Sequence, residues 1–152
     1  MSRIDFYHLT NTNIYKALLN LLEKVSLQKR HVIIRTESIM VAEEIDEMLW
    51  TYNVSKFIPH SIVGDRYSGS SPIHITNESE NPNRAEFLFI INIANLSASE
   101  MSKFERTFVL FDSNDPEVLQ SAQKLWAELA NIIIDRHYWT QKTGGWELEK
   151  LP

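Results

Sequence analysis

The sequence has no cysteine among its 152 residues and only four glycines. Without cysteine, the chain can form no disulfide bond, no thiolate metal site and no catalytic thiol. None of the glycines lies where a predicted strand turns into a helix, which is where dinucleotide fingerprints and P-loops bring the backbone close to phosphate. The only adjacent pair, Gly144 and Gly145, lies near the C-terminus. A nucleotide cofactor bound by such a loop is therefore not expected.

Long apolar runs are also lacking, since no segment approaches the roughly 18 consecutive apolar residues of a membrane helix. The first residues, MSRIDFYHL, show neither the apolar core nor the cleavage site of a signal peptide. These features predict a soluble, cytoplasmic protein. Acidic residues outnumber basic ones by 20 to 15, which gives a net charge of −5. That charge repels phosphate backbones, so contact with DNA is expected only indirectly, through protein partners.

What the sequence does contain is an alternation of strand-like and helix-like segments. Short apolar or alternating runs predict strands at 3–9, 31–36, 72–76, 86–93 and 106–112. Helical spacing predicts helices at 13–27, from a cap at 36 or 38 to about 52, at 97–104 and at 113–137. Residues from about 138 to 152 are predicted to form an irregular aromatic tail. The alternation predicts one α/β domain over residues 1–152, a three-layer sandwich with a mostly parallel central sheet, Rossmann-like but without a phosphate-binding loop.

The five histidines give little indication of chemistry. None has the helical spacing or the cysteine neighbours of a metal site, so no metal is predicted. His8 and His31 fall at the ends of predicted strands and are the best candidates for an acid–base pair, although no nucleophile motif accompanies them. A small α/β enzyme that uses this pair, or carboxylates, is therefore an alternative function.

The segment DEMLWTYNVSKFIPH, residues 46–60, places much apolar surface where a helix is predicted to end. Trp50 and Phe57 lie in this segment, and Trp139 and Trp146 lie in the predicted tail, all four outside periodic elements. Exposed aromatic patches usually mark partner sites, whereas loop aromatics also cap the ends of sheets. The residues alone leave both interpretations open.

Eight short motifs cover nearly the whole chain in a fixed order. They are FYHL (6–9), LQKRHVII (27–34), DEMLW (46–50), FIPH (57–60), PIHI (72–75), LFIINI (88–93), FD (111–112) and AQKLW (122–126). In this set and order the sequence resembles the chi subunit of bacterial DNA polymerase III holoenzyme. The resemblance implies a non-catalytic, cofactor-free subunit that pairs with the psi subunit in the clamp-loader assembly. It also implies binding of the acidic, Phe-terminated tail of single-stranded-DNA-binding protein and, in some bacteria, a repair helicase at the psi surface.

The resemblance implies two sets of site residues. The surface for psi or a helicase would be formed by Trp50, Phe57, Ile58, Pro59 and His60. The site for the tail of single-stranded-DNA-binding protein would be formed by Phe111, Gln123, Lys124 and Trp126. The family has an arginine where this chain has Gln123, so the cation for the carboxylate of the tail must come from elsewhere. Lys124 points about 100° around the helix from Gln123, and Arg136 and Lys142 are further candidates.

Overall fold

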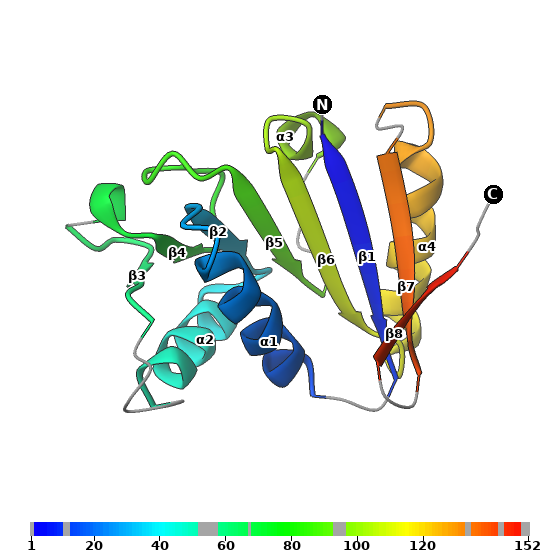
Figure 1. Cartoon of the computed structure of the whole chain (residues 1–152), viewed down its shortest axis with the longest axis horizontal. Helices are drawn as coiled ribbons and strands as arrows, with labels where there is room; N and C mark the ends of the chain where they lie inside the picture. The colour runs from blue at the N-terminus through cyan, green and yellow to red at the C-terminus, as the bar shows by residue number, and fades with distance from the viewer. Residues whose placement is uncertain are drawn as a thin grey trace.

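The computed structural model describes residues 2–10, 13–51, 58–66, 68–92, 97–132, 135–142 and 145–149, and Figure 1 shows the course of the chain. Its centre is one eight-stranded sheet in the order β3-β4-β2-β5-β6-β1-β7-β8. The strands are β1 (Arg3–Leu9), β2 (Val32–Arg35), β3 (Ser61–Ile62), β4 (Ile73–Thr76), β5 (Phe87–Ile91), β6 (Arg106–Asp112), β7 (Asp135–Lys142) and β8 (Gly145–Glu149). Neighbouring strands are parallel except for the antiparallel pair β7 and β8.

Helices lie on both faces of the sheet, with α1 and α2 on one face and α3 and α4 on the other (Figure 1). Their bounds are α1 (Ile14–Ser26), α2 (Ile39–Thr51), α3 (Ala98–Met101) and α4 (Pro116–Leu129), and a 3-10 turn spans Ser68–Ser70. The chain moves toward one edge of the sheet through α1 and α2, and toward the other edge through α3 and α4. Because parallel crossovers are right-handed, opposite directions of travel place the helices on opposite faces. The predicted three-layer α/β sandwich is confirmed.

Side-chain caps fix where α1 and α4 begin. The Asn13 side chain accepts a hydrogen bond from the Tyr15 N–H at 2.8 Å, and Asp115 accepts one from the Glu117 N–H at 3.0 Å. Pro116 follows in the first turn of α4, where its missing N–H would have had no helical partner. Each helix then turns an apolar stripe toward the sheet, and the buried residues of α1 are Ala17, Leu18, Leu19, Leu21, Leu22 and Val25.

The sheet separates two hydrophobic cores, one beneath α1 and α2 and one beneath α3 and α4. In the first core Phe89 and Phe108 stack with a centroid distance of 4.3 Å. In the second core Phe6 and Trp126 meet edge to face at 5.3 Å. The central strands β2 and β5 are buried at every residue. A parallel sheet covered on both faces requires such continuous apolar strands.

The C-terminal segment corrects the prediction. The last helix ends at Leu129 instead of near residue 137, and the tail that was predicted to be irregular contains β7 and the edge strand β8. Pairing with β1 explains the difference, because β7 lies in parallel register beside that strand along most of its length. Tyr138 then packs in the core beneath α4 and Trp139 packs against the core beneath α1. This two-residue alternation is the period of a strand. The short strand β3 has no counterpart among the predicted strands.

Candidate protein-docking surfaces

Trp50 stands at the end of α2 with 59% of its surface exposed. Its ring meets the ring of His60 at a centroid distance of 5.1 Å and an interplanar angle of 64°. The His60 side chain is buried, with Nδ1 hydrogen-bonded to the carbonyl oxygen of Ile58 at 2.7 Å and Nε2 3.1 Å from an Asp46 carboxylate oxygen. His60 therefore links residues 58–60 to α2, and Trp50 lies outside the core.

The structure brings together the described members of the predicted partner surface. Ile58 is half-buried and packs against the core beneath α1 and α2, Pro59 is exposed, and His60 contacts Trp50. Phe57 belongs to the same prediction but lies outside the described residues. Trp50 and Pro59 are both exposed, and His60 contacts one in space and follows the other in sequence, so we name Trp50, Ile58, Pro59 and His60 the Trp50 patch.

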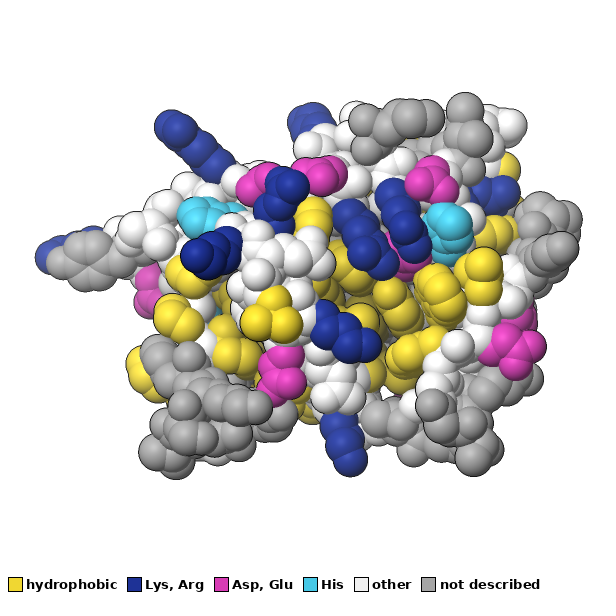
Figure 2. Space-filling view, viewed as in Figure 1, with side chains coloured by type: hydrophobic (Ala, Val, Ile, Leu, Met, Phe, Trp, Pro, Cys, Tyr) yellow, Lys and Arg dark blue, Asp and Glu magenta, His cyan; other side chains and the backbone are white. Residues whose placement is uncertain are grey.

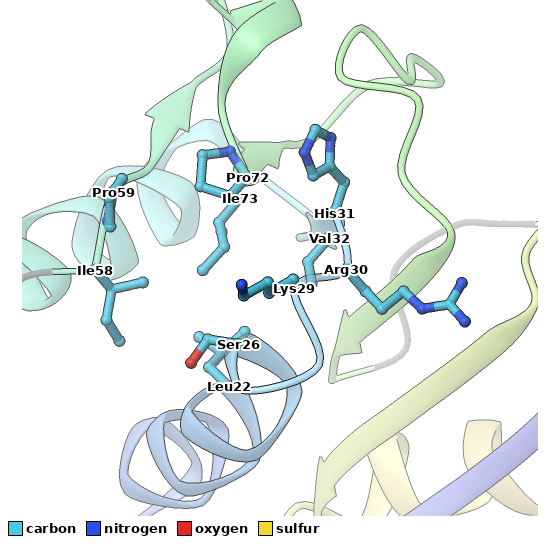
Figure 3. Close-up of a pocket in the computed structure, with 10 residues that line it drawn as sticks. All are labelled: Leu22, Ser26, Lys29, Arg30, His31, Val32, Ile58, Pro59, Pro72 and Ile73. Atoms are coloured by element: carbon cyan, nitrogen blue, oxygen red, sulfur yellow. The ribbon is translucent and has the colours of Figure 1, made fainter.

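A cavity of about 340 Å³ adjoins this patch, between the end of α1 and the amino ends of β2 and β4 (Figure 3). Ile58 and Pro59 line it, so the cavity is continuous with the Trp50 patch. Lys29 turns the chain from α1 into β2 with a left-handed backbone (φ 55°), and Figure 3 shows its side chain reaching toward the cavity. Arg30 points away from it and contacts Glu86 and Glu105. The cavity therefore has an apolar lining with one ammonium group near it.

A second cavity, of about 480 Å³, lies between α4 and the strands β1, β7 and β8, on the opposite face of the sheet. Two of the four predicted tail-binding residues, Gln123 and Trp126, line it. Phe111 is fully buried behind the wall of this cavity, with its ring 6.1 Å from the ring of Tyr138. Lys124 does not line the cavity, because its side chain is 79% exposed and its ammonium lies 4.0 Å from Glu128.

Arg136 places a cation on the ring of Trp126. Its guanidinium carbon lies 4.1 Å from the ring centroid, and its Nη1 donates a hydrogen bond to the Trp126 carbonyl oxygen at 2.6 Å. Arg136 reaches this position because it lies on β7, two residues before Tyr138, and therefore on the face of the sheet that carries α4. A guanidinium has five N–H donors, so the observed hydrogen bond leaves it able to bind a carboxylate as well.

The remaining titratable groups of this cavity set its charge. Burial lowers the pKa of His8 from its usual value, against an opposing effect of the Glu149 carboxylate, which favours the neutral form of its ring. Burial raises the pKa of Tyr138 to about 12, and Glu149 adds to the rise. The His8 ring Nδ1 and the Tyr138 hydroxyl are hydrogen-bonded at 2.6 Å. Glu149 is therefore the one charged group among the described residues that line the cavity.

The proposed pairing of His8 with His31 is wrong. His8 lies near the carboxyl end of β1 and His31 lies just before the amino end of β2. Because the strands are parallel, the two histidines lie at opposite ends of the strands. The His31 ring Nδ1 is hydrogen-bonded to the Asn83 carbonyl oxygen at 2.8 Å, which fixes it in the turn before β5. Within the described ranges, no group of three or more His, Asp and Glu side chains is placed to hold a metal ion. The described helices are also all too short or too polar to cross a membrane.

Comparison with known proteins shows to which family the chain belongs. A family model described as DNA polymerase III chi subunit, HolC, matches residues 1–132. The chain belongs to the DNA polymerase III chi subunit family. A relative from Rickettsia prowazekii (strain Madrid E), named "Probable DNA polymerase III subunit chi", is 34% identical over 117 residues, which cover 74% of this chain and 71% of the relative. The resemblance drawn from the eight motifs is confirmed.

The match to the chi family ends before part of the second cavity. The Trp50 patch and α4 lie within residues 1–132, whereas Tyr138, Thr140 and Glu149 come from β7 and β8. Sequence reasoning missed these three wall residues because it treated the tail as irregular. Residues 135–140 gave only a weak signal, because Arg136 and Tyr138 occupy alternate positions without an alternation of apolar and polar side chains.

Proposed function

We propose that this chi-family chain is a cytoplasmic, non-catalytic accessory subunit of a DNA polymerase III holoenzyme. It would belong to the clamp-loader assembly and connect the replicase to single-stranded-DNA-binding protein during DNA replication. The observation that carries the proposal is the exposure of Trp50 on α2 in a chain of this family. An exposed tryptophan is a common anchor of protein interfaces.

The Trp50 patch is the proposed site for the psi subunit. A partner helix would lie across Trp50 and Pro59 and insert an apolar side chain into the adjoining cavity of about 340 Å³. Phe57 would add a second ring to this contact. Covering one large side chain contributes about 1.5–3 kcal/mol, so Trp50 alone would supply a substantial part of the binding free energy. Lys29 beside the cavity favours an acidic residue on the partner.

The cavity beside α4 is the proposed site for the acidic tail of single-stranded-DNA-binding protein. The terminal phenylalanine would pack on Trp126 within the cavity, and the terminal carboxylate would bind the guanidinium of Arg136. In this arrangement Arg136 compensates for the uncharged Gln123, and Phe111 supports the aromatic wall from behind. Such a small contact predicts micromolar affinity.

A peptide with this acidic, Phe-terminated sequence tests the tail site by fluorescence anisotropy. Trp126→Ala should weaken binding by at least about tenfold, which is roughly 1.4 kcal/mol. Arg136→Gln should weaken it to a similar degree, and Lys124→Gln serves as the matched control because that side chain is exposed beside Glu128, whereas Arg136 lies on the ring of Trp126 at the cavity. If Lys124→Gln weakens binding and Arg136→Gln does not, the cation has been assigned to the wrong residue.

A pull-down with purified psi tests the Trp50 patch. Trp50→Ala should abolish capture, whereas Met40→Ala should not, because Met40 is a similarly exposed side chain at the other end of the same helix. Capture of psi by Trp50→Ala at the wild-type level would exclude this patch as its site. Co-purification of a helicase through Trp50, with psi absent, would instead favour a chi-like protein that acts in repair.

A further inference from the structure

Part of the sheet face that carries α1 has no helix over it. Figure 1 shows α1 and α2 on one half of this face, while the half formed by β1, β7 and β8 is open. A groove of about 280 Å³ lies there, between α1 and the β7–β8 hairpin. We name it the hairpin groove and define it by Tyr7, Lys24, Arg106, Phe108, Trp139 and Trp146. Figure 2 shows hydrophobic side chains gathered over this region, with Lys and Arg side chains beside them.

The floor of the hairpin groove is a row of aromatic rings stacked on one another. The Tyr7 ring stacks on Phe108 at 6.2 Å and on Trp139 at 6.4 Å, with interplanar angles of 16° and 10°. Trp146 meets Tyr7 edge to face at 5.1 Å. The guanidinium of Arg106 covers the Phe108 ring, 4.3 Å from its centroid. These contacts occupy the faces of the Tyr7 and Phe108 rings and leave both side chains buried, so the partly exposed surface of the groove comes from Trp139 and Trp146.

The open apolar strip is about as wide as one helix. Tyr7 lies opposite Trp139 in the β1–β7 register, and Trp139 lies opposite Leu148 in the β7–β8 register. Leu148 is 49% exposed and extends the strip to the edge of the sheet. Two strand spacings amount to about 10 Å, which is close to the 10–12 Å diameter of an α-helix with its side chains. A fold of this class is complete when helices cover both faces of the sheet.

The charges around the hairpin groove are positive although the chain as a whole carries −5. Lys24 lines it from α1, Arg106 lines it from β6, and none of the described lining residues is acidic. Asp5, which pairs with Arg106, is fully buried and shared between the guanidiniums of Arg106 and Arg3. Asp135 also acts on Arg3, so two carboxylates oppose two arginines and a lysine, and the exposed Lys24 leaves a local excess of positive charge, which favours an acidic ligand.

We propose that the hairpin groove binds an acidic amphipathic helix of a partner protein, which completes the helix layer on this face. The helix would place apolar side chains on Trp139, Trp146 and Leu148 and carboxylates beside Lys24 and Arg106. Single-stranded nucleic acid fits less well, because it needs a cationic groove that follows the backbone and free ring faces for its bases, whereas only Lys24 and Arg106 line this groove and the Tyr7 and Phe108 faces are already stacked. A drug-sized ligand also fits less well, since such pockets usually exceed about 300 Å³.

This surface is separate from both sites of the proposed function. The hairpin groove lies on the opposite face of the sheet from the cavity beside α4, which we call the tail cavity. It shares no lining residue with the cavity beside the Trp50 patch. Trp139, Trp146 and Leu148 also fall beyond the residues that match the chi family model. Failure of one proposal therefore leaves the other standing.

Designed peptides test the proposal against the full chain. The probe is a labelled peptide of about five helical turns with leucines on one face and glutamates on its flanks. Two companions replace the glutamates with lysines, or break the helix with central prolines. Only the acidic, unbroken peptide should bind in anisotropy titrations, and its affinity should fall with added salt.

Variants locate the binding on the hairpin groove. Lys24→Glu should weaken the acidic peptide at least about fivefold and Leu148→Ser should weaken it measurably. Lys16→Glu is the matched control on α1, outside the groove, and should change affinity much less. Both test positions are exposed, and a thermal melt shows that each variant folds. Binding of the proline peptide with equal affinity, tighter binding of an oligothymidine, no binding at all, or equal loss in Lys16→Glu would each overturn the proposal.

Discussion

Replacement of Asp5 by asparagine should destabilise the protein strongly, because four hydrogen bonds converge on this fully buried carboxylate. Arg3 donates through Nε and Nη2 at 3.0 and 2.9 Å, and Arg106 donates through Nε at 2.8 Å. The indole Nε1 of Trp139 donates at 2.9 Å. The carboxylate therefore joins β1 to the strands on both sides of it, including β7, which sequence reasoning did not foresee.

The expected loss is about 3 kcal/mol of unfolding free energy. Removing one partner of a buried ion pair typically costs about 3–5 kcal/mol. The lower end applies to Asp5→Asn, because the amide oxygen can still accept from Trp139 and because both arginines are partly exposed to water. In a chain of this size each kcal/mol lowers Tm by about 2–4 °C, so a decrease of about 6–12 °C is expected.

Urea denaturation at pH 7 measures this loss directly. Glu43→Gln is the matched control, since it removes an exposed carboxylate from α2 and should change stability by less than about 0.5 kcal/mol. The two variants isolate the effect of burial and pairing from that of a changed net charge. Equal unfolding midpoints for Asp5→Asn and Glu43→Gln would refute the reasoning.

The pH dependence gives a second test of the same carboxylate. Burial raises the pKa of Asp5, but the hydrogen bonds from Arg3 and Trp139 and the charge of Arg106 outweigh it and hold this pKa below its usual value. A depressed pKa contributes stability that is present above the unfolded carboxyl pKa of about 3.9 and is lost as pH falls through the folded value. The stability gap between wild type and Asp5→Asn should therefore narrow below about pH 4. A gap that widens there would contradict the assigned charge.

Three further substitutions separate core, surface and site. Leu49→Ala should lower the unfolding free energy by about 2–5 kcal/mol in urea denaturation, because Leu49 is buried. The neighbouring Trp50→Ala should lower it by less than about 0.5 kcal/mol. Similar losses in the two variants would show that Trp50 belongs to the core. Glu149→Gln removes the negative charge from the tail cavity, so the acidic tail peptide should bind about twofold to fivefold more tightly in anisotropy, and weaker binding would place that peptide elsewhere. Asn83→Ala removes the side-chain amide that donates to the buried carbonyl oxygens of Val32 and Ser71 at 3.1 and 2.9 Å. A thermal melt should show a loss of about 1–3 kcal/mol of unfolding free energy, and an unchanged Tm would contradict this expectation.

The local sequence pattern was sufficient to predict the strands and helices whose buried positions are continuous or periodic. Residues 3–9 and 106–112 were predicted as strands and form β1 and β6 with those bounds. The end of α4 was not predictable in this way, because residues 130–137 contain apolar positions compatible with either period. Pairing of β7 with β1 decides between them, and that pairing joins segments more than 130 residues apart. A single-sequence reading of propensity cannot include such a contact.

The Trp50 patch and the tail cavity also differ in how much of each could be predicted from local sequence. Trp50 and Pro59 are close in the sequence to the helix end that exposes them, so their apolar excess was visible as a local feature. The cation on Trp126 was not, because Arg136 reaches that ring only when β7 has joined the sheet. The pairing of His8 with His31 was wrong for a related reason. Both residues lie at strand ends in the sequence, but the parallel strand direction places one at a carboxyl end and the other at an amino end.

The loops after β1 and β6 occupy the place where many nucleotide-binding α/β sheets hold phosphate. The Ser113 N–H and hydroxyl both donate to the Leu9 carbonyl oxygen, at 3.0 and 2.8 Å, and thereby tie the two strand ends together. The N-terminus of α4 beside them is occupied as well, because Asp115 caps it with a carboxylate and Pro116 lacks an N–H. A phosphate there would meet a negative charge and one fewer donor, which reverses the usual preference of a helix N-terminus for anions. The chain thus keeps the sheet of that fold while Ser113 and Asp115 use the hydrogen-bonding groups at these strand ends for its own structure, and the apolar side chains that it exposes include Trp50 and, on the β7–β8 hairpin, Leu148.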